Sequence, residues 1–321
     1  MRWVARRPAR TLADVLDDVL HDASAPPVRD GWDDDRPGDD GRIGSLQAAL
    51  DHAARAAALI GGWTEDDPLR LSKGMVTWLL RCPRRALAGT EVGATDDLVA
   101  GLAVDAAAKL ATLVPQRTPT VDAALGYLDA TGDTIAADHL ADRGDAAGTL
   151  LDDIGARIER LAAVWPPIDP GWWPRVEEPV RSRLAGGVVM VGGRLDLLLG
   201  GPPTSRPAVV IEVKGGRWYD GMRTDGHLYA LLVSLRDGRP PAAVVTLVAD
   251  GTTQVEPVRA AVLATAADRV EQAMRVAANV AVGETPAAHA GPHCAHCPVR
   301  PDCAVGRAWR ADEATVGVAG L

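Results

Sequence analysis

The stretch Ala208-Val-Val-Ile-Glu212-Val-Lys214-Gly-Gly216 places two charged side chains in an otherwise apolar run that ends at a pair of glycines. Apolar, β-branched residues bounded by Gly and Pro signals predict a buried strand over 208–214. Glu212 and Lys214 are two residues apart, so on a strand both side chains project from the same face. Burying a charge is costly unless it is paired or binds a metal. The stretch therefore predicts either a structural ion pair or part of a functional site.

A second predicted strand upstream supplies another carboxylate. Residues 191–199 read Val-Gly-Gly-Arg-Leu-Asp-Leu-Leu-Leu, and Asp196 is the only carboxylate among them. If the two strands are neighbours, Asp196 and Glu212 converge on one hard cation with oxygen ligands, and Lys214 reaches the same place. The alternative is a structural salt bridge between Lys214 and one of the carboxylates.

The hydrophobic pattern around these strands predicts a mixed α/β fold. A strand, a helix and a second strand follow one another from 208 to 249, which implies a right-handed crossover onto a mixed sheet. The acidic segment 29–42, which contains Gly and Pro, is expected to be a solvated linker. Helical patterns are expected at 10–22, 43–60, 72–88, 94–165 with breaks at Pro115 and Pro119, 220–237 and 259–282. Strands are expected at 175–184, 188–199, 208–214, 242–249 and 253–258.

The chain has four cysteines, and their positions suit a shared metal centre. Three form a C-x2-C-x5-C run near the C-terminus and one lies far upstream: Cys294, Cys297, Cys303 and Cys82. A two-residue spacing lets both sulfurs turn towards one centre, which suits a 4Fe–4S cluster. Zinc is equally compatible, with four cysteines or with His293 or His296 replacing one of them. Disulfides are the less favoured alternative, because the chain lacks the cysteine density of a small secreted scaffold.

Composition predicts a soluble, cytoplasmic, folded protein. The 321 residues are 47% hydrophobic, and the formal net charge of −9 argues against a generally nucleic-acid-binding surface, although one basic groove can coexist with an acidic exterior. The charged start has no apolar segment behind it, so no secretory signal is expected. No stretch approaches the roughly 18 apolar residues of a membrane span. Only Lys73, Lys109 and Lys214 among the 34 basic residues are lysines, which suggests that a compact ammonium is needed at such positions.

Gly193-Arg-Leu-Asp196 followed by Glu212-Val-Lys214 resembles the D…E-x-K signature of the PD-(D/E)XK nuclease superfamily. The form is similar to that of RecB-like nucleases, including the nuclease domain of AddB and the CRISPR-associated RecB-like exonucleases. Several of these hold a 4Fe–4S cluster with one cysteine before the nuclease core and three after it, which is the order found here. The resemblance covers about residues 71–308. It implies a restriction-endonuclease-like mixed sheet core flanked by helices, with a C-terminal iron–sulfur staple.

The resemblance also implies roles for particular residues. The implied catalytic residues are Asp196, Glu212, Lys214 and Tyr229, and the implied ligands of Mg²⁺ or Mn²⁺ are Asp105, Asp196, Glu212 and the backbone carbonyl of Val213. The four cysteines would hold the 4Fe–4S cluster.

Two positions depart from the family pattern. Asp105 occupies the place of the family's metal-binding His in a Gly-x3-His context, and a carboxylate remains a competent ligand for Mg²⁺ or Mn²⁺. Asp225 occupies the Gln position of the family's Gln-x3-Tyr, with Tyr229 retained and His227 in a place to compensate. An ordinary helix-surface role is the alternative for both aspartates.

The implied function is metal-dependent hydrolysis of DNA, as an exonuclease on single-stranded or end-containing DNA, in repair, recombination or defence. One alternative is a catalytically weak relative that binds DNA or a partner protein, and another is a zinc-ribbon-like module on an unrelated α/β domain. No Gly-x4-Gly-Lys-Ser/Thr loop is present, so a helicase or a defence-system protein would be a separate partner. Candidate phosphate contacts are Arg81, Arg84, Arg85, Arg217 and Arg223.

Two aromatic residues follow the Glu-x-Lys strand. Trp218 and Tyr219 could stack on bases of single-stranded DNA, and core packing is the alternative for Trp218. The expected domains are a helical extension with an acidic linker at 1–70 and a nuclease domain at 71–321. The latter is expected to divide into a helical part at 71–170, a catalytic core at 174–282 and a cysteine cluster at 290–310.

Overall fold

A computed structural model describes residues 40–88, 93–115, 118–165 and 168–309 of the chain. The predicted helix at 10–22 lies outside the described residues, as does the acidic segment up to residue 39. The chain divides into two compact units, each built from separate segments. The described part of the first unit holds Ala94–Val180 and Arg194–Leu263, and the second begins with Gly41–Gly93 and Arg181–Gly193 and continues from Ala264.

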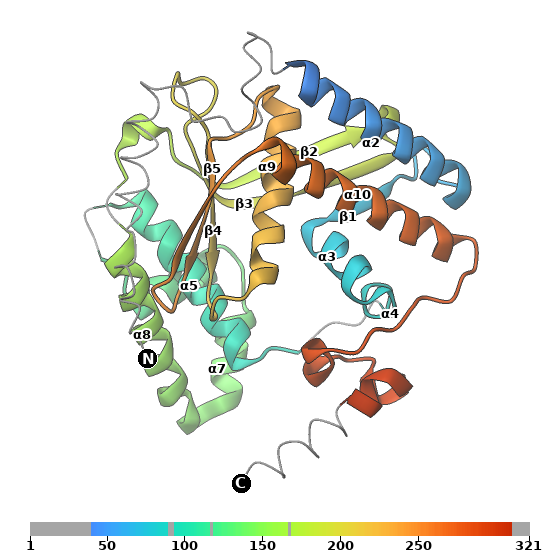
Figure 1. Ribbon diagram of the computed structural model, residues 1–321. Helices are drawn as coiled ribbons and strands as arrows, with labels where there is room; N and C mark the ends of the chain where they lie inside the picture. The colour runs from blue at the N-terminus through green and yellow to red at the C-terminus, as the bar shows by residue number, and fades with distance from the viewer. Residues whose placement is uncertain (1–39, 89–92, 116–117, 166–167, 310–321) are drawn as a thin grey trace, which may run out of the picture. The chain divides into compact units, whose positions relative to one another are not determined.

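The strands form one mixed sheet, which confirms the predicted fold class. The order is β1-β3-β4-β5-β6, with β2 paired to β3 (Figure 1). The strands are β1 (Leu69–Ser72), β2 (Arg175–Leu184), β3 (Val189–Leu199), β4 (Val209–Lys214), β5 (Ala243–Val248) and β6 (Thr253–Pro257). β4 pairs antiparallel with β3 and parallel with β5, and β5 pairs antiparallel with β6. The parallel pair is joined through α9 (Arg223–Asp237), as the strand–helix–strand pattern predicts.

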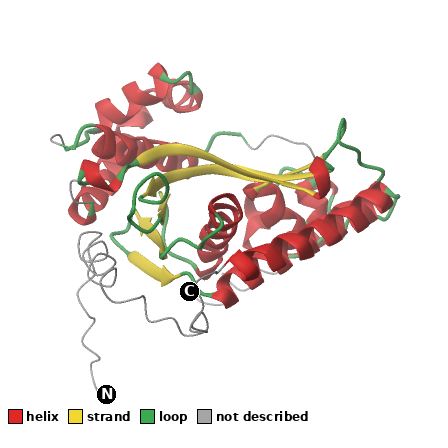
Figure 2. Cartoon of the chain, turned by 90° about the horizontal axis from the view of Figure 1, so that it is seen from above, coloured by secondary structure: helices red, strands yellow, loops and turns green. Residues whose placement is uncertain are grey.

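Helices of the first unit cover both faces of β4 and β5. One face packs against a group of four helices, and Ile211, Val213 and Val245 share a hydrophobic core with those helices. That group consists of α5 (Asp96–Leu113), α6 (Val121–Ala130), α7 (Ile135–Arg143) and α8 (Ala147–Val164). The alternate residues face α9, where Gly226 lies directly against Val244. Successive residues of a strand point to opposite faces, so neighbouring residues of β4 and β5 pack against different groups of helices. Figure 2 shows the helices in red and the strands in yellow.

The N-terminus of α5 is set by an N-cap threonine and by acidic residues in the first turn. The Thr95 hydroxyl accepts a hydrogen bond from the Leu98 backbone N–H at 3.2 Å, and acidic residues occupy the first turn. An N-cap threonine and first-turn carboxylates both stabilise a helix N-terminus. This cap fixes where α5 begins.

The second unit contains one strand that the sequence pattern did not predict. β1 pairs in parallel with the start of β3, with Leu71 opposite Val191. Four residues are too few to show alternation, and their pairing partner is distant in sequence, so a helix starting at residue 72 was expected instead. The helix α3 (Lys73–Arg81) begins after Ser72, whose side chain caps it by accepting from the Met75 N–H at 3.1 Å.

The remaining helices of the second unit are α2 (Asp40–Gly61), α4 (Pro83–Ala86) and most of α10 (Ala260–Ala281). α2 begins at Asp40, so the end of the segment expected to be a linker is helical. The predicted helix at 72–88 is interrupted after Arg81, because Pro83 starts a new short helix there. None of the described helices is both long and apolar enough to span a membrane.

A contact between two glycines brings α5 to the end of β4. Gly215 follows β4 directly, and a Cβ atom placed on it would overlap the backbone of Gly101 in α5. Only glycine permits such a close approach of two backbones. Asp105 lies four residues after Gly101, about one helical turn further along α5. The contact therefore sets the position of Asp105 relative to β4.

Gly215→Ala should lower the free energy of unfolding by about 1–3 kcal/mol, the usual cost of overpacking, because its methyl group would push α5 away from β4. Gly216→Ala is the matched control, since a Cβ there has no atom within 4 Å. Urea denaturation of both variants measures the difference. Equal stabilities for the two variants would contradict the role given to this contact.

Candidate functional site

The carboxylates of β3 and β4 meet where their pairing ends. The pairing of β3 with β4 ends with Leu197 opposite Ile211, so Asp196 and Glu212 are the next residue of each strand. Asp196 Oδ2 accepts a hydrogen bond from the Val213 backbone N–H at 2.7 Å. Glu212 is 0% exposed. The two strands are thus neighbours, which is the condition under which the sequence predicted that Asp196 and Glu212 converge.

Lys214 forms ion pairs with two carboxylates. Its Nζ lies 2.9 Å from Glu212 Oε2 and 2.9 Å from Asp225 Oδ2, in the first turn of α9. Burial disfavours the charged ammonium, but the attraction of Glu212 and Asp225 outweighs it, and the pKa of Lys214 is raised. Lys214 is therefore charged at neutral pH. The salt bridge left open as an alternative is present, and Asp225 takes part in it rather than lying on an exposed helix surface.

Three carboxylates from three different elements form a second group in the first unit. Side-chain oxygens of Asp105 in α5, Glu177 in β2 and Asp196 in β3 all lie within 4.8 Å of one another. All three residues are half-buried. Clustered carboxylate oxygens are the ligands that Mg²⁺ and similar hard cations prefer. This group is the candidate metal site.

Basic side chains partly balance this charge. Lys109 Nζ pairs with Asp105 Oδ2 at 2.5 Å and also with Glu177 Oε1, while Arg194 Nη1 lies 2.8 Å from Glu177 Oε2. Burial disfavours the Lys109 ammonium, but Asp105 and Glu177 outweigh it, so the pKa of Lys109 is raised. Lys109 and Arg194 therefore offset part of the negative charge of the acidic group, and Lys109 lies between two of its members.

Asp105 retains an oxygen that can accept a ligand. Burial raises the pKa of Asp105, and repulsion from Glu177 and Glu212 adds to this, against the opposing attraction of Lys109. Asp105 Oδ1 is buried and makes no hydrogen bond with any residue that the structure describes. An unsatisfied buried oxygen beside two other carboxylates fits a divalent cation. The placement of Asp105 beside Asp196 matches the position expected for it from the sequence, and its role as a ligand stays a prediction, as does that of the Val213 carbonyl.

Glu177 is the member of the group that sequence reasoning missed. Its φ of 54° is unusual for a residue with a side chain, and such outliers often occur at functional sites. The neighbouring Glu178 pairs instead with Arg175 and Arg236. The available signal was a pair of adjacent glutamates in a predicted strand, because consecutive strand residues point to opposite faces.

Two further residues of α9, Tyr229 and His227, contact residues other than Lys214 and the three clustered carboxylates. Tyr229 is buried, and its hydroxyl donates to the Arg194 carbonyl oxygen at 2.5 Å. His227 Nε2 lies 2.8 Å from Glu256 Oε2 in β6. Tyr229 therefore anchors β3 two residues from Asp196, whereas His227 contacts Glu256, and its compensating role stays a prediction. A catalytic role for Tyr229 stays a prediction.

The four cysteines all belong to the second unit. Each is a free thiol, and Cys82, Cys294 and Cys303 are buried while Cys297 is half-buried. The disulfide alternative is therefore not what this structure contains. In the described residues no three of the sulfurs lie within 4.8 Å of one another. The structure thus shows four thiols on the same unit, without showing an assembled centre.

Hydrogen bonds tie the residues around Cys82 to the segments around the other cysteines. The Arg84 backbone N–H donates to the Ala287 carbonyl at 2.9 Å, and Arg84 Nη2 donates to the Asp302 carbonyl at 2.7 Å. His289 Nδ1 lies 3.0 Å from the Arg81 carbonyl oxygen. The Gly306 N–H donates to Cys303 Sγ at 3.4 Å. The distant cysteine is therefore held next to the C-terminal run, as a shared centre requires.

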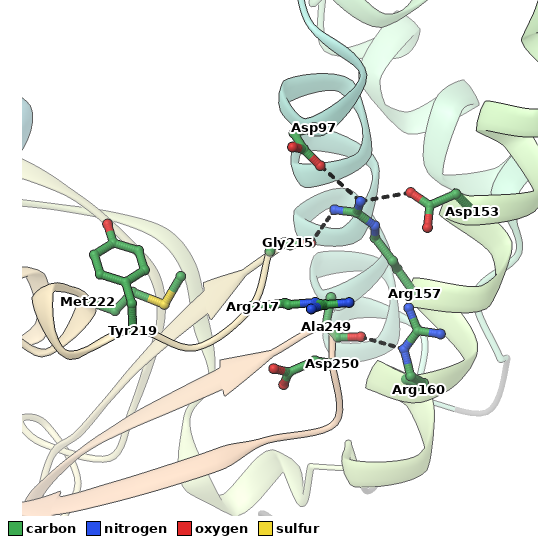
Figure 3. A pocket seen from close by; sticks show the side chains of 11 residues that line it. Asp97, Asp153, Arg157, Arg160, Gly215, Arg217, Tyr219, Met222, Ala249 and Asp250 are labelled. Atoms are coloured by element: carbon green, nitrogen blue, oxygen red, sulfur yellow. Dashed lines mark hydrogen bonds and ion pairs between the residues drawn. The ribbon is translucent and has the colours of Figure 1, made fainter. Parts of the chain in front are cut away.

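The arginines proposed to contact phosphate divide into two groups. Arg81 and Arg85 lie over the Trp78 ring, at 5.5 and 5.2 Å from its centroid. Arg223 lies over the half-buried Trp218, at 5.7 Å. Arg217 instead lines a pocket beside the end of β4 (Figure 3). Only the pocket arginine is thus free of an aromatic or backbone partner among the described residues.

Comparison with known proteins identifies one family. The model of the PD-(D/E)XK nuclease superfamily matches residues 70–304. The solved structure of SSO0001 is 15% identical, with a TM-score of 0.33 over 73% of this chain and 85% of that one. A structure from Eubacterium rectale with a provisional exonuclease description is 12% identical, with a TM-score of 0.45 over 71% and 87% of the two chains. Both likenesses are too distant to bear on function. No curated protein sequence matches at a significant level.

Glu177→Gln should weaken Mn²⁺ binding at least about tenfold, the loss that even an outer-shell partner produces, because it removes one charged oxygen ligand. Glu178→Gln is the matched control, since that carboxylate lies next to Glu177 but pairs with Arg175 and Arg236. Isothermal titration calorimetry with Mn²⁺ measures both affinities. If Glu177→Gln bound Mn²⁺ as tightly as the control, the three-carboxylate site would be wrong.

Proposed function

The chain belongs to the PD-(D/E)XK nuclease superfamily, and we propose that it is a Mg²⁺- or Mn²⁺-dependent nuclease that hydrolyses phosphodiester bonds in DNA. The observation that carries the proposal is the convergence of Asp105, Glu177 and Asp196 from three elements, next to the buried Glu212–Lys214 pair. Acidic residues and a charged lysine at one point suit phosphate-ester chemistry at a metal.

The carboxylates would hold the cation. Asp105, Glu177 and Asp196 supply oxygens within 4.8 Å of one another, and Glu212 lies near enough to raise the pKa of Asp105. A bound Mg²⁺ or Mn²⁺ lowers the pKa of a water molecule and neutralises charge on the phosphate. A bound cation would share with the Lys109 ammonium the task of balancing the negative charge of Asp105 and Glu177.

Lys214 supplies a fixed positive charge next to the reacting phosphate. Its two ion pairs hold the ammonium in place, and its raised pKa keeps it protonated at neutral pH. A preorganised charge in a partly buried site stabilises the negative charge that develops on the phosphate more strongly than it would in water. Asp225 orients Lys214 and at the same time offsets part of its charge.

The partial offset of the Lys214 charge by Asp225 favours the alternative of a catalytically weak relative. A lysine shared between Glu212 and Asp225 has less net charge to offer a phosphate, which would give a catalytically weak relative that binds DNA or a partner protein. A cleavage assay with labelled single- and double-stranded DNA and Mn²⁺ separates the two. We favour the active enzyme, acting as an exonuclease on single-stranded or end-containing DNA in repair, recombination or defence, with any helicase or defence-system protein as a separate partner.

We also propose that the four cysteines hold a 4Fe–4S cluster. Support comes from the four free thiols of the second unit and from the contacts of Arg84 and His289 that join the segments around them. N–H donation to sulfur, as from Gly306 to Cys303, is a means by which proteins tune such clusters. The cluster would be structural and would cross-link the helix ending at Cys82 to the C-terminal run. The division into an extension at 1–70 and a nuclease domain at 71–321 stays part of the proposal.

Asp196→Ala and Glu212→Ala should each abolish Mn²⁺-dependent cleavage and weaken metal binding, because each removes charge from the cation site. Asp129→Ala, which removes an exposed carboxylate of α6, is the control for both carboxylate variants. Wild-type cleavage by either carboxylate variant would place the chemistry elsewhere.

Lys214→Ala should keep metal binding and slow cleavage by about 10²–10³-fold, the loss typical of one preorganised electrostatic contact. Lys214→Arg should restore the cleavage rate only partly, since a planar guanidinium is not a compact charge.

Anaerobically purified protein should be brown and contain about four irons per chain. Cys82→Ala should lose iron and melt at a lower temperature, because the link between the distant segments is lost. Glu212→Ala should keep its iron content, since the two centres are built from different residues. Absorption spectroscopy, metal analysis and thermal melting provide the measurements. Colourless protein with one zinc per chain would contradict the iron–sulfur assignment.

A further inference from the structure

A pocket in the first unit opens directly beyond the end of β4. It encloses about 720 Å³, a volume within the range of small-molecule and cofactor sites. Gly215 and Gly216, the residues that follow Lys214, form part of its lining (Figure 3). A ligand in this pocket would therefore lie one or two residues along the chain from the proposed catalytic lysine.

Arg157 forms a fixed wall of the pocket. Its Nη1 donates to the Gly215 carbonyl at 2.7 Å, and its Nη2 pairs with Asp97 at 3.0 Å and with Asp153 at 2.8 Å. These contacts pair one guanidinium with two carboxylates, so the group keeps a net negative charge, and they hold the Gly215 backbone against α8. Arg157 therefore shapes the pocket, and its positive charge is fully offset by its neighbours.

Two other arginines have donor groups available. Arg160 uses Nε to donate to the Ala249 carbonyl at 2.9 Å, and its terminal nitrogens make no hydrogen bond with the residues that the structure describes. Arg217 is exposed and makes no ion pair or hydrogen bond within those same residues. Both guanidinium groups reach towards the same cavity in Figure 3. Guanidinium groups of this kind are suited to phosphate.

The third aspartate of the lining is engaged by the backbone. Asp250 Oδ1 accepts from the Thr252 N–H at 2.9 Å, and Oδ2 accepts from the Trp218 N–H at 3.3 Å. Asp250 thus orders the loop after β5 and holds the segment that leads to Tyr219. Arg160 also attracts Asp250 electrostatically. Among the residues that the structure describes, Arg160 and Arg217 are the lining arginines whose terminal nitrogens make no hydrogen bond.

An aromatic ring stands across the opening from these arginines. Tyr219 is 54% exposed and lines the pocket, and its ring is seated against Gly221, which has no side chain to displace it. Aromatic side chains next to basic ones are the arrangement by which proteins hold single-stranded nucleic acid, through base stacking and phosphate contacts.

We propose that this pocket receives one nucleotide of a single-stranded DNA segment next to the scissile phosphate, with its phosphate on Arg160 and Arg217 and its base on Tyr219. The inference rests on the proposed nuclease function and specifies the form of the substrate. The pocket volume is large enough for a nucleotide unit. Stacking is tolerant of base identity, so the subsite selects an unpaired strand without selecting its sequence.

The test measures binding of a fluorescein-labelled single-stranded oligothymidylate by anisotropy in EDTA, so that cleavage does not interfere. Tyr219→Ala should weaken binding roughly 5- to 150-fold, the range for losing one stacked base, and Tyr219→Phe should restore it. Arg217→Ala should weaken binding and lower the slope of log K against log salt concentration by about 0.7, the value for one phosphate contact on a single strand. Arg239→Ala, an exposed arginine in the loop after α9, is the control for charge loss.

The outcomes separate this inference from the nuclease proposal. If Tyr219→Ala and Arg217→Ala bound the oligonucleotide as Arg239→Ala does, the pocket would not be the strand subsite, even with wild-type cleavage intact. Wild-type protein that failed to bind the oligonucleotide would also overturn the inference. Binding that depends on Tyr219 and Arg217 in a protein that never cleaves DNA with Mn²⁺ would instead keep the subsite and refute the enzyme.

Discussion

The buried negative charge of Glu212 is the constraint on which the rest of the first unit depends. Glu212 lies in the middle of the sheet at 0% exposure, where an unpaired carboxylate would cost several kcal/mol. Lys214 lies on the same face of β4 and pairs with it, and Asp225 pairs with Lys214 from α9. Because both partners come from the strand and from the helix that covers it, α9 must pack with its first turn at the end of β4.

The chain has few lysines, and two of them lie where buried or half-buried carboxylates need a positive partner. Two of its three lysines, Lys109 and Lys214, each bridge two carboxylates, and both have raised pKa values because those carboxylates outweigh burial. Arginine is preferred elsewhere, as in the Arg157 contacts with Asp97 and Asp153. A compact ammonium fits between two carboxylates in a small space, whereas a planar guanidinium spreads its donors. The rarity of lysine in the sequence was therefore informative about the site.

How much the sequence predicted depends on whether a feature is local. The apolar run at 208–214 and the single carboxylate in 191–199 were enough to predict two strands, and to predict that Asp196 and Glu212 converge if those strands are neighbours. β1 escaped prediction because its four residues gain their strand conformation from a distant partner, Val191 among others. Glu177 escaped because its partners Asp105 and Asp196 come from other elements, and its positive φ is a backbone feature that no sequence period encodes. The ion pairs of Lys109 were equally hidden, since they join residues of α5 and β2.

The acidic net charge of the chain does not measure the field at the end of β4. The net value of −9 sums the whole chain, whereas a ligand near Lys214 responds to the groups within a few ångströms. There Asp97 and Asp153 share Arg157, and Asp250 accepts hydrogen bonds from two backbone N–H groups, while Arg160 and Arg217 keep donors available. The three aspartates and three arginines of the pocket lining therefore balance one another instead of reproducing the acidic excess of the whole chain. A chain that is acidic overall can in this way keep guanidinium donors available to a phosphate.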